Sequence, residues 1–314
     1  MKLEGIHHIT AVTGDAPANV DFYAGLLGLR MVKKTVNQDD PTVYHLFYAD
    51  ELGSPGADLT FFEYPGEPRG QAGDGMVHRI VWRVESREAL DFWQQRLEQE
   101  GIAVARSATS IVFADHEGLS LEFTVDSSRD LPLRARHPDV PAGMAIRGFE
   151  GVRAFSSAPQ ESAALFEQTL GFMPQGDGSP NAWTVRGNHR GSWYRFDSPE
   201  GRRPMPGAGT VHHVAWASQM DDHAAWRDRV VAAGMRPTPI IDRFWFRSVY
   251  FREPSGVLFE IATLGPGFTV DEDLETLGER LVLPPTFEPL RARLEQILTP
   301  LPNPRERVER LSAP

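Results

Sequence analysis

The stretch "GIHHITAV" at residues 5–12 returns in altered form as "TVHHVAWA" at 210–217, so two adjacent histidines begin an apolar run twice in one chain. Two further runs, "VHRIVWRV" at 77–84 and "FEGVRAF" at 149–155, open in a similar way without the full pair. Self-similar segments at regular intervals indicate a repeated structural unit. The sequence therefore predicts four copies of one unit, which we call modules 1 to 4.

Each module continues in the same order after its first strand. A polar residue suited to the N-cap of a helix follows the strand, and a glycine suited to a left-handed helix end closes the helical pattern. The predicted caps are Asp15, Ser86, Ser157 and Asp221, and the closing glycines are Gly28, Gly101, Gly171 and Gly234. Runs rich in Val, Phe, Thr and Tyr then indicate antiparallel hairpins. The predicted fold is α+β, with four βαβββ modules forming two paired-module domains of curved mixed sheets.

Linkers rich in Pro, Gly and charge suggest where these domains divide. The longest, at 126–143, favours an N-terminal domain at 1–135 containing modules 1 and 2, and a C-terminal domain at 145–265 containing modules 3 and 4. The repeat stops near residue 265. We expect the extension at 266–314 to form short helical or irregular pieces that pack over the sheets.

Composition restricts the chemistry. The chain of 314 residues contains no cysteine, so a metal site would have to use histidine and carboxylate ligands. A net charge of −11 disfavours a nucleic-acid partner. No apolar run approaches the roughly 20 residues of a membrane span, and the first ten residues lack a signal-peptide pattern, so we expect no membrane partner and a cytoplasmic location.

The four modules act as an internal control for the histidine pair. Neighbouring residues of a strand point to opposite faces, so only one histidine of each pair can enter a shared cavity. The column containing His8 and His213 reads Arg79 and Gly151 in the other two modules, so the fold does not dictate it. We therefore predict that His8 and His213 project into a cavity, with His7 and His212 as supporting residues.

A third group comes from the last strand, "VLFEIA", where a carboxylate within an apolar run needs a partner or a metal. A hairpin turn centred on Ser255 would place Tyr250 directly across from this residue, Glu260, on the same face. In module 2 the matching Glu122 is expected to form a salt bridge with Arg79 instead.

Two imidazoles and one carboxylate form the facial arrangement that holds non-heme Fe(II) and leaves positions open for substrate and O₂, although Mn²⁺, Zn²⁺ or Ni²⁺ could use the same donors. Glu63 is the candidate for a fourth ligand. Two alignments of module 1 with module 4 are possible. Matching the apolar runs places Glu63 at the position of Glu260, whereas matching Gly56 to Gly256 places Thr60 there. We favour three ligands.

At this point the sequence resembles a known family. The segments around "LEGIHHITAV", "GTVHHVAWA" and "DRFWFRSVYFREPSGVLFEIA" are similar to the vicinal oxygen chelate superfamily, and within it to the ring-cleaving dioxygenases of hydroquinones and catechols. The resemblance implies Fe(II), or Mn(II), held by His8, His213 and Glu260. It further implies a small aromatic substrate and O₂. Acid–base or supporting roles would fall to His7, Thr10, His212 and Tyr250, with Arg243 near the substrate.

Other interpretations stay open at this stage. A metal-dependent isomerase or thiol transferase of the same fold would use a four-ligand site, and a metal-free module binding aromatic ligands would have lost the ligands that are kept here. Trp245 and Phe246 could wall a planar substrate or simply pack in a sheet. His45, a lone histidine on a strand, is assigned a structural role. The oligomeric state is open, a homo-oligomer included.

Overall fold

The computed structural model describes residues 1–176, 181–301, 303 and 304. Module 1 contains β1 (Ile6–Thr13), α1 (Ala16–Val20) with a π-helical continuation (Asp21–Leu26), β2 (Arg30–Val36), β3 (Tyr44–Ala49) and β4 (Asp58–Glu63). Module 2 contains β5 (Val77–Val84), α2 (Arg87–Gln99), β6 (Ala105–Arg106), β7 (Ser110–Ala114) and β8 (Ser120–Val125).

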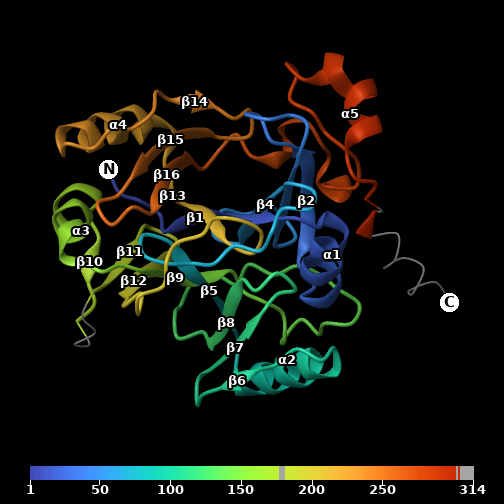
Figure 1. Cartoon of the computed structure of the whole chain (residues 1–314), viewed down its shortest axis with the longest axis horizontal. Helices are drawn as coiled ribbons and strands as arrows, with labels where there is room; N and C mark the ends of the chain where they lie inside the picture. Colours follow the sequence, from blue (N-terminus) through green and yellow to red (C-terminus); the bar gives the residue numbers. More distant parts are fainter. Residues whose placement is uncertain (177–180, 302, 305–314) are drawn as a thin grey trace.

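Modules 3 and 4 repeat this order. Module 3 contains β9 (Phe149–Phe155), α3 (Gln160–Ala164) with a π-helical continuation (Leu165–Leu170), β10 (Met173–Pro174), β11 (Ala182–Arg186) and β12 (Gly191–Asp197). Module 4 contains β13 (Val211–Ser218), a 3₁₀ turn (Met220–Asp222), α4 (His223–Ala232), β14 (Ile241–Asp242), β15 (Arg247–Arg252) and β16 (Leu258–Thr263). The predicted α+β fold of four βαβββ modules in curved mixed sheets is confirmed (Figure 1).

The helix boundaries agree with the prediction at the C-terminal ends and in part at the N-terminal ends. All four closing glycines have φ between +69° and +83°. Asp15 and Ser86 cap their helices by accepting hydrogen bonds from the amides of Ala18 and Ala89. The other two predicted caps were wrong: Ser157 lies before α3 and bonds Asp74, and Asp221 lies inside a 3₁₀ turn that precedes α4.

The sheets do not follow the predicted domain division. In the first sheet the strand order is β14-β15-β16-β13-β1-β4-β3-β2, so module 4 is joined to module 1 through antiparallel β1 and β13. In the second, the order β10-β11-β12-β9-β5-β8-β7-β6 joins module 3 to module 2. The grouping of modules 1 and 2 at 1–135, and of 3 and 4 at 145–265, therefore describes stretches of the chain and not the paired sheets.

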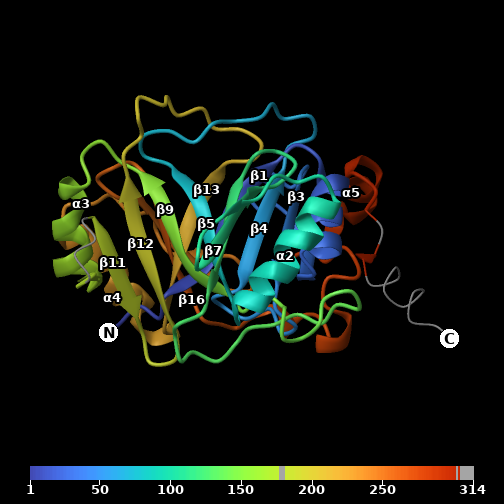
Figure 2. The same ribbon diagram turned by 90° about the horizontal axis from the view of Figure 1, so that it is seen from below.

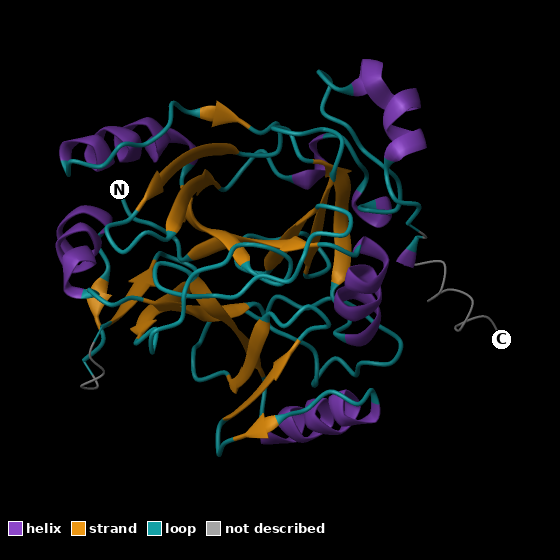
Figure 3. Cartoon of the chain, in the orientation of Figure 1, coloured by secondary structure: helices purple, strands orange, loops and turns teal. Residues whose placement is uncertain are grey.

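The helices lie at the periphery, with α3 and α4 on one side of the molecule and α1 and α5 (Arg291–Ile297) on the other (Figures 1 and 3). Seen from below, the central strands of both sheets run side by side between them (Figure 2). Ile9, Trp82 and Trp216 are fully buried in the larger apolar core. A smaller apolar cluster, which includes Phe47 and Trp245, lies on the opposite face of the first sheet, where the candidate site is found.

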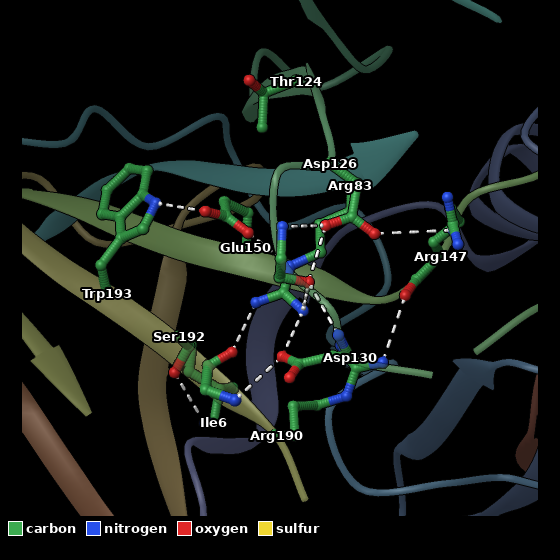
Figure 4. A network of polar contacts seen from close by, with 12 residues as sticks. Ile6, Arg83, Thr124, Asp126, Asp130, Arg147, Glu150, Arg190, Ser192 and Trp193 are labelled. Carbon is green, nitrogen blue, oxygen red and sulfur yellow. Dashed lines mark hydrogen bonds and ion pairs between the residues drawn. The ribbon is translucent and has the colours of Figure 1, made fainter. Parts of the chain in front are cut away.

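A buried network of charges joins the linker between modules 2 and 3 to the second sheet (Figure 4). Arg83 of β5 contacts Glu150 and Asp130, with its Nη1 2.7 Å from Asp130 Oδ2. Asp130 also pairs with Arg186 at 2.8 Å. Burial by itself raises the pKa of Asp130, but the two arginines outweigh it and lower that pKa below its ordinary value. These contacts fix the linker against the sheet.

The described part of the C-terminal extension is held against the first sheet by polar contacts, and residues 302 and 305–314 of the predicted extension lie outside the described residues. The buried ammonium of Lys33 on β2 pairs with Asp271 at 2.9 Å and also with Glu272. Farther on, the hydroxyl of Thr299 donates to Glu63 Oε1 at 2.8 Å. None of the helices in the described ranges is long and apolar enough to cross a bilayer.

Candidate metal centre

Strand register alone brings the predicted ligands together. In the antiparallel pair β1 and β13, Thr10 lies opposite His213 and His8 lies opposite Ala215. Ala215 is in turn the parallel neighbour of Glu260 on β16. The prediction that Tyr250 stands across the hairpin from Glu260 is confirmed. Residues from both ends of the chain therefore meet on one face of one sheet.

Three side chains converge at the centre of this face. His213 Nε2 lies 2.9 Å from Glu260 Oε2, His8 Nε2 lies 3.2 Å from the same oxygen, and the two imidazole nitrogens are 3.2 Å apart. All three residues are at most 3% exposed. Among the described residues, these three form the one group of three or more histidine, cysteine, aspartate or glutamate side chains that could hold a metal ion.

The spacing of the donors fits an ion with octahedral ligands. Two ligand atoms at about 2.1 Å from an ion and at right angles to each other are about 3.0 Å apart, and this resembles the observed separations. Such a facial set occupies one side of the ion and leaves the other side open. The donor set therefore fits a divalent metal ion, without selecting among the metals that the sequence left open.

Hydrogen bonds around His8 determine which nitrogen carries its proton. His7 Nε2 lies 3.1 Å from the carbonyl oxygen of Thr263, which can only accept, so this nitrogen carries the proton of His7. Burial, followed by His8, lowers the pKa of His7 to about 3, so the ring is neutral and its Nδ1 accepts. His8 Nδ1, 2.9 Å away, must then be the donor. The Nε2 lone pair of His8 is left facing Glu260.

The same pairing recurs on β13, where His212 Nδ1 lies 2.8 Å from His213 Nδ1. Burial lowers the pKa of His213, which favours its neutral form. Burial raises the pKa of Glu260, but His8 and His213, when either carries a proton, lower it well below its ordinary value. Glu260 Oε1 has no hydrogen-bond partner among the described residues. Three electron-rich atoms thus face each other, an arrangement that a cation would stabilise.

Tyr250 and Arg243 lie beside this triad. The ring of Tyr250 is 5.6 Å from that of His213, and the guanidinium of Arg243 lies 5.5 Å from the Tyr250 ring centre. Arg243 also forms a bidentate pair with Asp39 at 2.8 and 3.0 Å. Burial and the charge of Glu260 raise the pKa of Tyr250, against the opposing effect of Arg243, so its phenol is protonated at neutral pH.

A narrow pocket opens onto the triad, and its walls are largely aromatic. The lining includes Phe47, Phe62, Trp245 and Phe246, together with His45. Phe246 approaches His8 with 5.1 Å between ring centres. Trp245 is fixed from behind, because its indole N–H donates to Asp271 of the C-terminal extension at 3.0 Å. Trp245 and Phe246 therefore form part of the cavity wall as well as packing in the smaller apolar cluster.

Comparison with known proteins agrees with this arrangement. A profile described as "Glyoxalase/Bleomycin resistance protein/Dioxygenase superfamily" matches residues 5–123 and 149–261. The chain belongs to this superfamily. It is 40% identical to the "Putative ring-cleaving dioxygenase MhqO" of Bacillus subtilis, over 95% of this chain and 97% of that protein.

A more distant relative in the superfamily is the chlorohydroquinone/hydroquinone 1,2-dioxygenase of Sphingobium indicum, which is 31% identical over 93% of this chain and 95% of that protein. The crystal structure of a "putative dioxygenase" from Bacillus subtilis superposes with a TM-score of 0.88 at 38% identity, covering 96% of this chain and 98% of that one. The likeness thus spans the whole fold.

The register of module 1 shows which of its residues corresponds to Glu260 of module 4. Thr60 pairs with Thr10 across β1 and β4, as Glu260 pairs with Ala215 across β13 and β16. Thr60 is therefore the counterpart of Glu260. Glu63 lies elsewhere and accepts hydrogen bonds from Ala16 N and Thr299. The alternative alignment that placed Glu63 on Glu260 was wrong.

The sequence predicts a structural role for His45, and the structure places its side chain at the pocket. His45 lines the pocket, and its Nε2 lies 2.9 Å from Thr60 Oγ1. The available signal was the hairpin register: His45 pairs with Phe62, two residues beyond Thr60 on the same face. Arg79 and Glu122 of module 2 form the predicted salt bridge at 3.2 Å.

Proposed function

We propose that this protein is a metal-dependent ring-cleaving dioxygenase that opens a hydroquinone- or catechol-type ring with O₂. The observation that carries the proposal is the buried facial triad of His8, His213 and Glu260, with a threonine where the repeated fold could have supplied a second carboxylate as a fourth ligand. An ion held by three protein ligands keeps positions for two further partners. The names of the full-length relatives support the same reaction class.

The three triad residues would hold Fe(II), or alternatively Mn(II). When bound, the ion supplies the Lewis-acid and redox chemistry that allows an aromatic diol and O₂ to react. His7 orients the His8 ring through the Nδ1 contact and is itself fixed by the Thr263 carbonyl. His212 is placed to do the same for His213.

The remaining residues would bind the ring and handle protons. Phe246 and Trp245 offer flat apolar surfaces to a planar substrate. Tyr250, protonated and adjacent to Glu260, can donate a hydrogen bond to an oxygen held at the triad and can supply its proton. Arg243 keeps positive charge at the edge of the Tyr250 ring.

Oxygen consumption tests the proposal. Protein purified without air and loaded with Fe(II) should take up O₂ with a hydroquinone or a catechol. The His213→Ala variant should not, and the matched His78→Ala variant, which changes a half-buried histidine of the second sheet paired with Asp197, should retain activity. Turnover of an α-keto aldehyde thioadduct or an electrophilic antibiotic without O₂, in the absence of any ring substrate, would assign the site to isomerase or thiol-transferase chemistry instead.

A further inference from the structure

A chain of hydrogen bonds leads from the triad on the side away from Tyr250. Thr10 Oγ1 lies 3.0 Å from His213 Nε2 and 2.8 Å from Thr60 Oγ1. Thr60 Oγ1 in turn lies 2.9 Å from His45 Nε2. Both threonines are fully buried, whereas His45 is half-buried and lines the pocket. Three side chains on three adjacent strands thus connect the triad with the pocket.

The fold does not require these residues. Matching β3 and β4 to β15 and β16 through Thr60 and Glu260 places Phe47 on Tyr250 and His45 on Ser248. The module 4 half of the site therefore presents a carboxylate and a phenol, and the module 1 half presents a hydroxyl and an imidazole. The triad therefore has two chemically different sides. The module 4 side contains Tyr250, and the module 1 side contains Thr60 and His45.

The direction of the hydrogen bonds follows once His213 Nε2 holds an ion. Thr10 has two hydrogen-bonding neighbours among the described residues, His213 Nε2 and Thr60 Oγ1, and the ion removes the first as an acceptor. Thr10 must then donate to Thr60, and Thr60 donates to His45 Nε2. His45 consequently carries its proton on Nδ1, for which the described residues provide no hydrogen-bond partner.

We propose that Thr10, Thr60 and His45 form a proton relay between an oxygen held at the triad and the pocket, and that His45 passes the proton on by exchanging tautomers. This inference rests on the proposed function. A substrate hydroxyl gives its proton to Thr10, the proton of Thr10 moves to Thr60, and that of Thr60 moves to His45 Nε2. The Nδ1 proton then leaves to water in the pocket.

The balance of this transfer is simple. The substrate becomes a phenolate, both threonines end as neutral hydroxyls, His45 ends as its Nε2–H tautomer, and one proton reaches solvent. Burial, followed by the charges of His8, His213 and Arg243, lowers the pKa of His45 well below its ordinary value. A ring that does not retain an extra proton is suited to passing it on.

Kinetics of the Fe(II)-loaded protein test the relay. Thr60→Val should lower kcat for oxygen uptake by about 10²-fold, as expected for loss of a general acid–base path. KM and iron content should stay unchanged, and Thr60→Ser should restore kcat to within a few-fold. Thr124→Val, which removes a threonine hydroxyl from β8 in the second sheet, is the matched control. An unaltered kcat in Thr60→Val would overturn the relay.

A second measurement does not depend on turnover. In the Zn²⁺-loaded protein with ¹⁵N-labelled histidine, His45 should be the Nδ1–H tautomer, and its Nε2 resonance should move in Thr60→Val while those of the triad histidines do not. A His45→Gln spectrum assigns the resonances. An Nε2–H tautomer in the parent would overturn the relay even if the enzyme is active. A parent that consumes no O₂ would contradict the proposed function, and the tautomer would still decide the relay.

Discussion

Replacing Glu260 by glutamine should change stability in opposite directions with and without metal. In the metal-free protein Oε2 faces two imidazole nitrogens, at 2.9 and 3.2 Å, and Oε1 has no hydrogen-bond partner among the described residues. An amide nitrogen at the Oε2 position could donate to both imidazoles in their Nδ1–H forms. Removing a buried, incompletely paired charge is worth about 1–3 kcal/mol.

The expected shifts in Tm follow from the chain length. Unfolding entropies of about 2.1 cal/mol/K per residue give about 0.7 kcal/mol/K for 314 residues. In EDTA, Glu260→Gln should therefore melt about 2–4 °C above the parent. With free metal at 1,000 times Kd, the parent gains about 4.1 kcal/mol, or about 6 °C, while the variant retains two of three ligands and gains little.

Thermal unfolding followed by circular dichroism measures the Tm of the parent and of the variant, first in EDTA and then with Fe(II) under nitrogen or with Zn²⁺. The key result is the reversal: the variant melts higher in EDTA and lower with metal. A variant that melts below the parent in EDTA would refute the argument, because Glu260 would then be held by a protonated imidazole and the triad would be a stable ion pair without metal. Glu122→Gln, which changes the salt-bridged counterpart in module 2, is the control and should show no metal dependence.

Three further outcomes are expected. Tyr250→Phe should keep its metal content and lose about 10²-fold in kcat, measured by oxygen uptake, since it removes the phenolic proton but preserves the ring; unchanged turnover would assign Tyr250 to packing. Asp130→Asn should cost about 3–5 kcal/mol at pH 7 in chemical denaturation, because Arg83 loses a buried partner. The folded pKa of Asp130 lies below its unfolded value, so its stabilisation is present above pH 4 and is lost as the pH falls, and the variant should show a shallower acid decline than the parent. Thr35→Val should raise the free energy of unfolding by about 1 kcal/mol, because the buried Thr35 hydroxyl lacks a hydrogen-bond partner in the described part of the chain; a loss of stability would indicate an unseen partner.

Local patterns in the sequence predicted the modules well. The closing glycines sit where the chain needs positive φ, a demand that one residue type meets at low cost. The two-residue period of a strand fixed the faces of β1, so that Ile9 enters the core while His8 faces the site. Tyr250 could be placed opposite Glu260 because the two residues lie on neighbouring strands of one hairpin, which a short turn connects.

What depends on distant partners could not be obtained in this way. A linker marks where the chain leaves one unit, but the pairing of β1 with β13 is decided by strand edges about 200 residues apart. A lone histidine in "VYHLFY" reads the same whether it packs or faces a pocket, so His45 could be placed only through the register of β3 against β4. The role that we propose for His45 depends on Thr60 and Thr10 of two neighbouring strands. Ser157 resembles a helix cap, yet Asp74 of another module engages it.

The union of the first and last modules in one sheet affects how the protein must be made. While the ribosome is still adding module 3, β1 has no β13 beside it, and its backbone amides form an open edge next to a helix-covered apolar face. Nascent chains stalled before residue 211 should therefore need chaperone protection more than the finished protein does. Because Glu260 lies on β16, the triad is complete only after residue 260 has emerged from the ribosome.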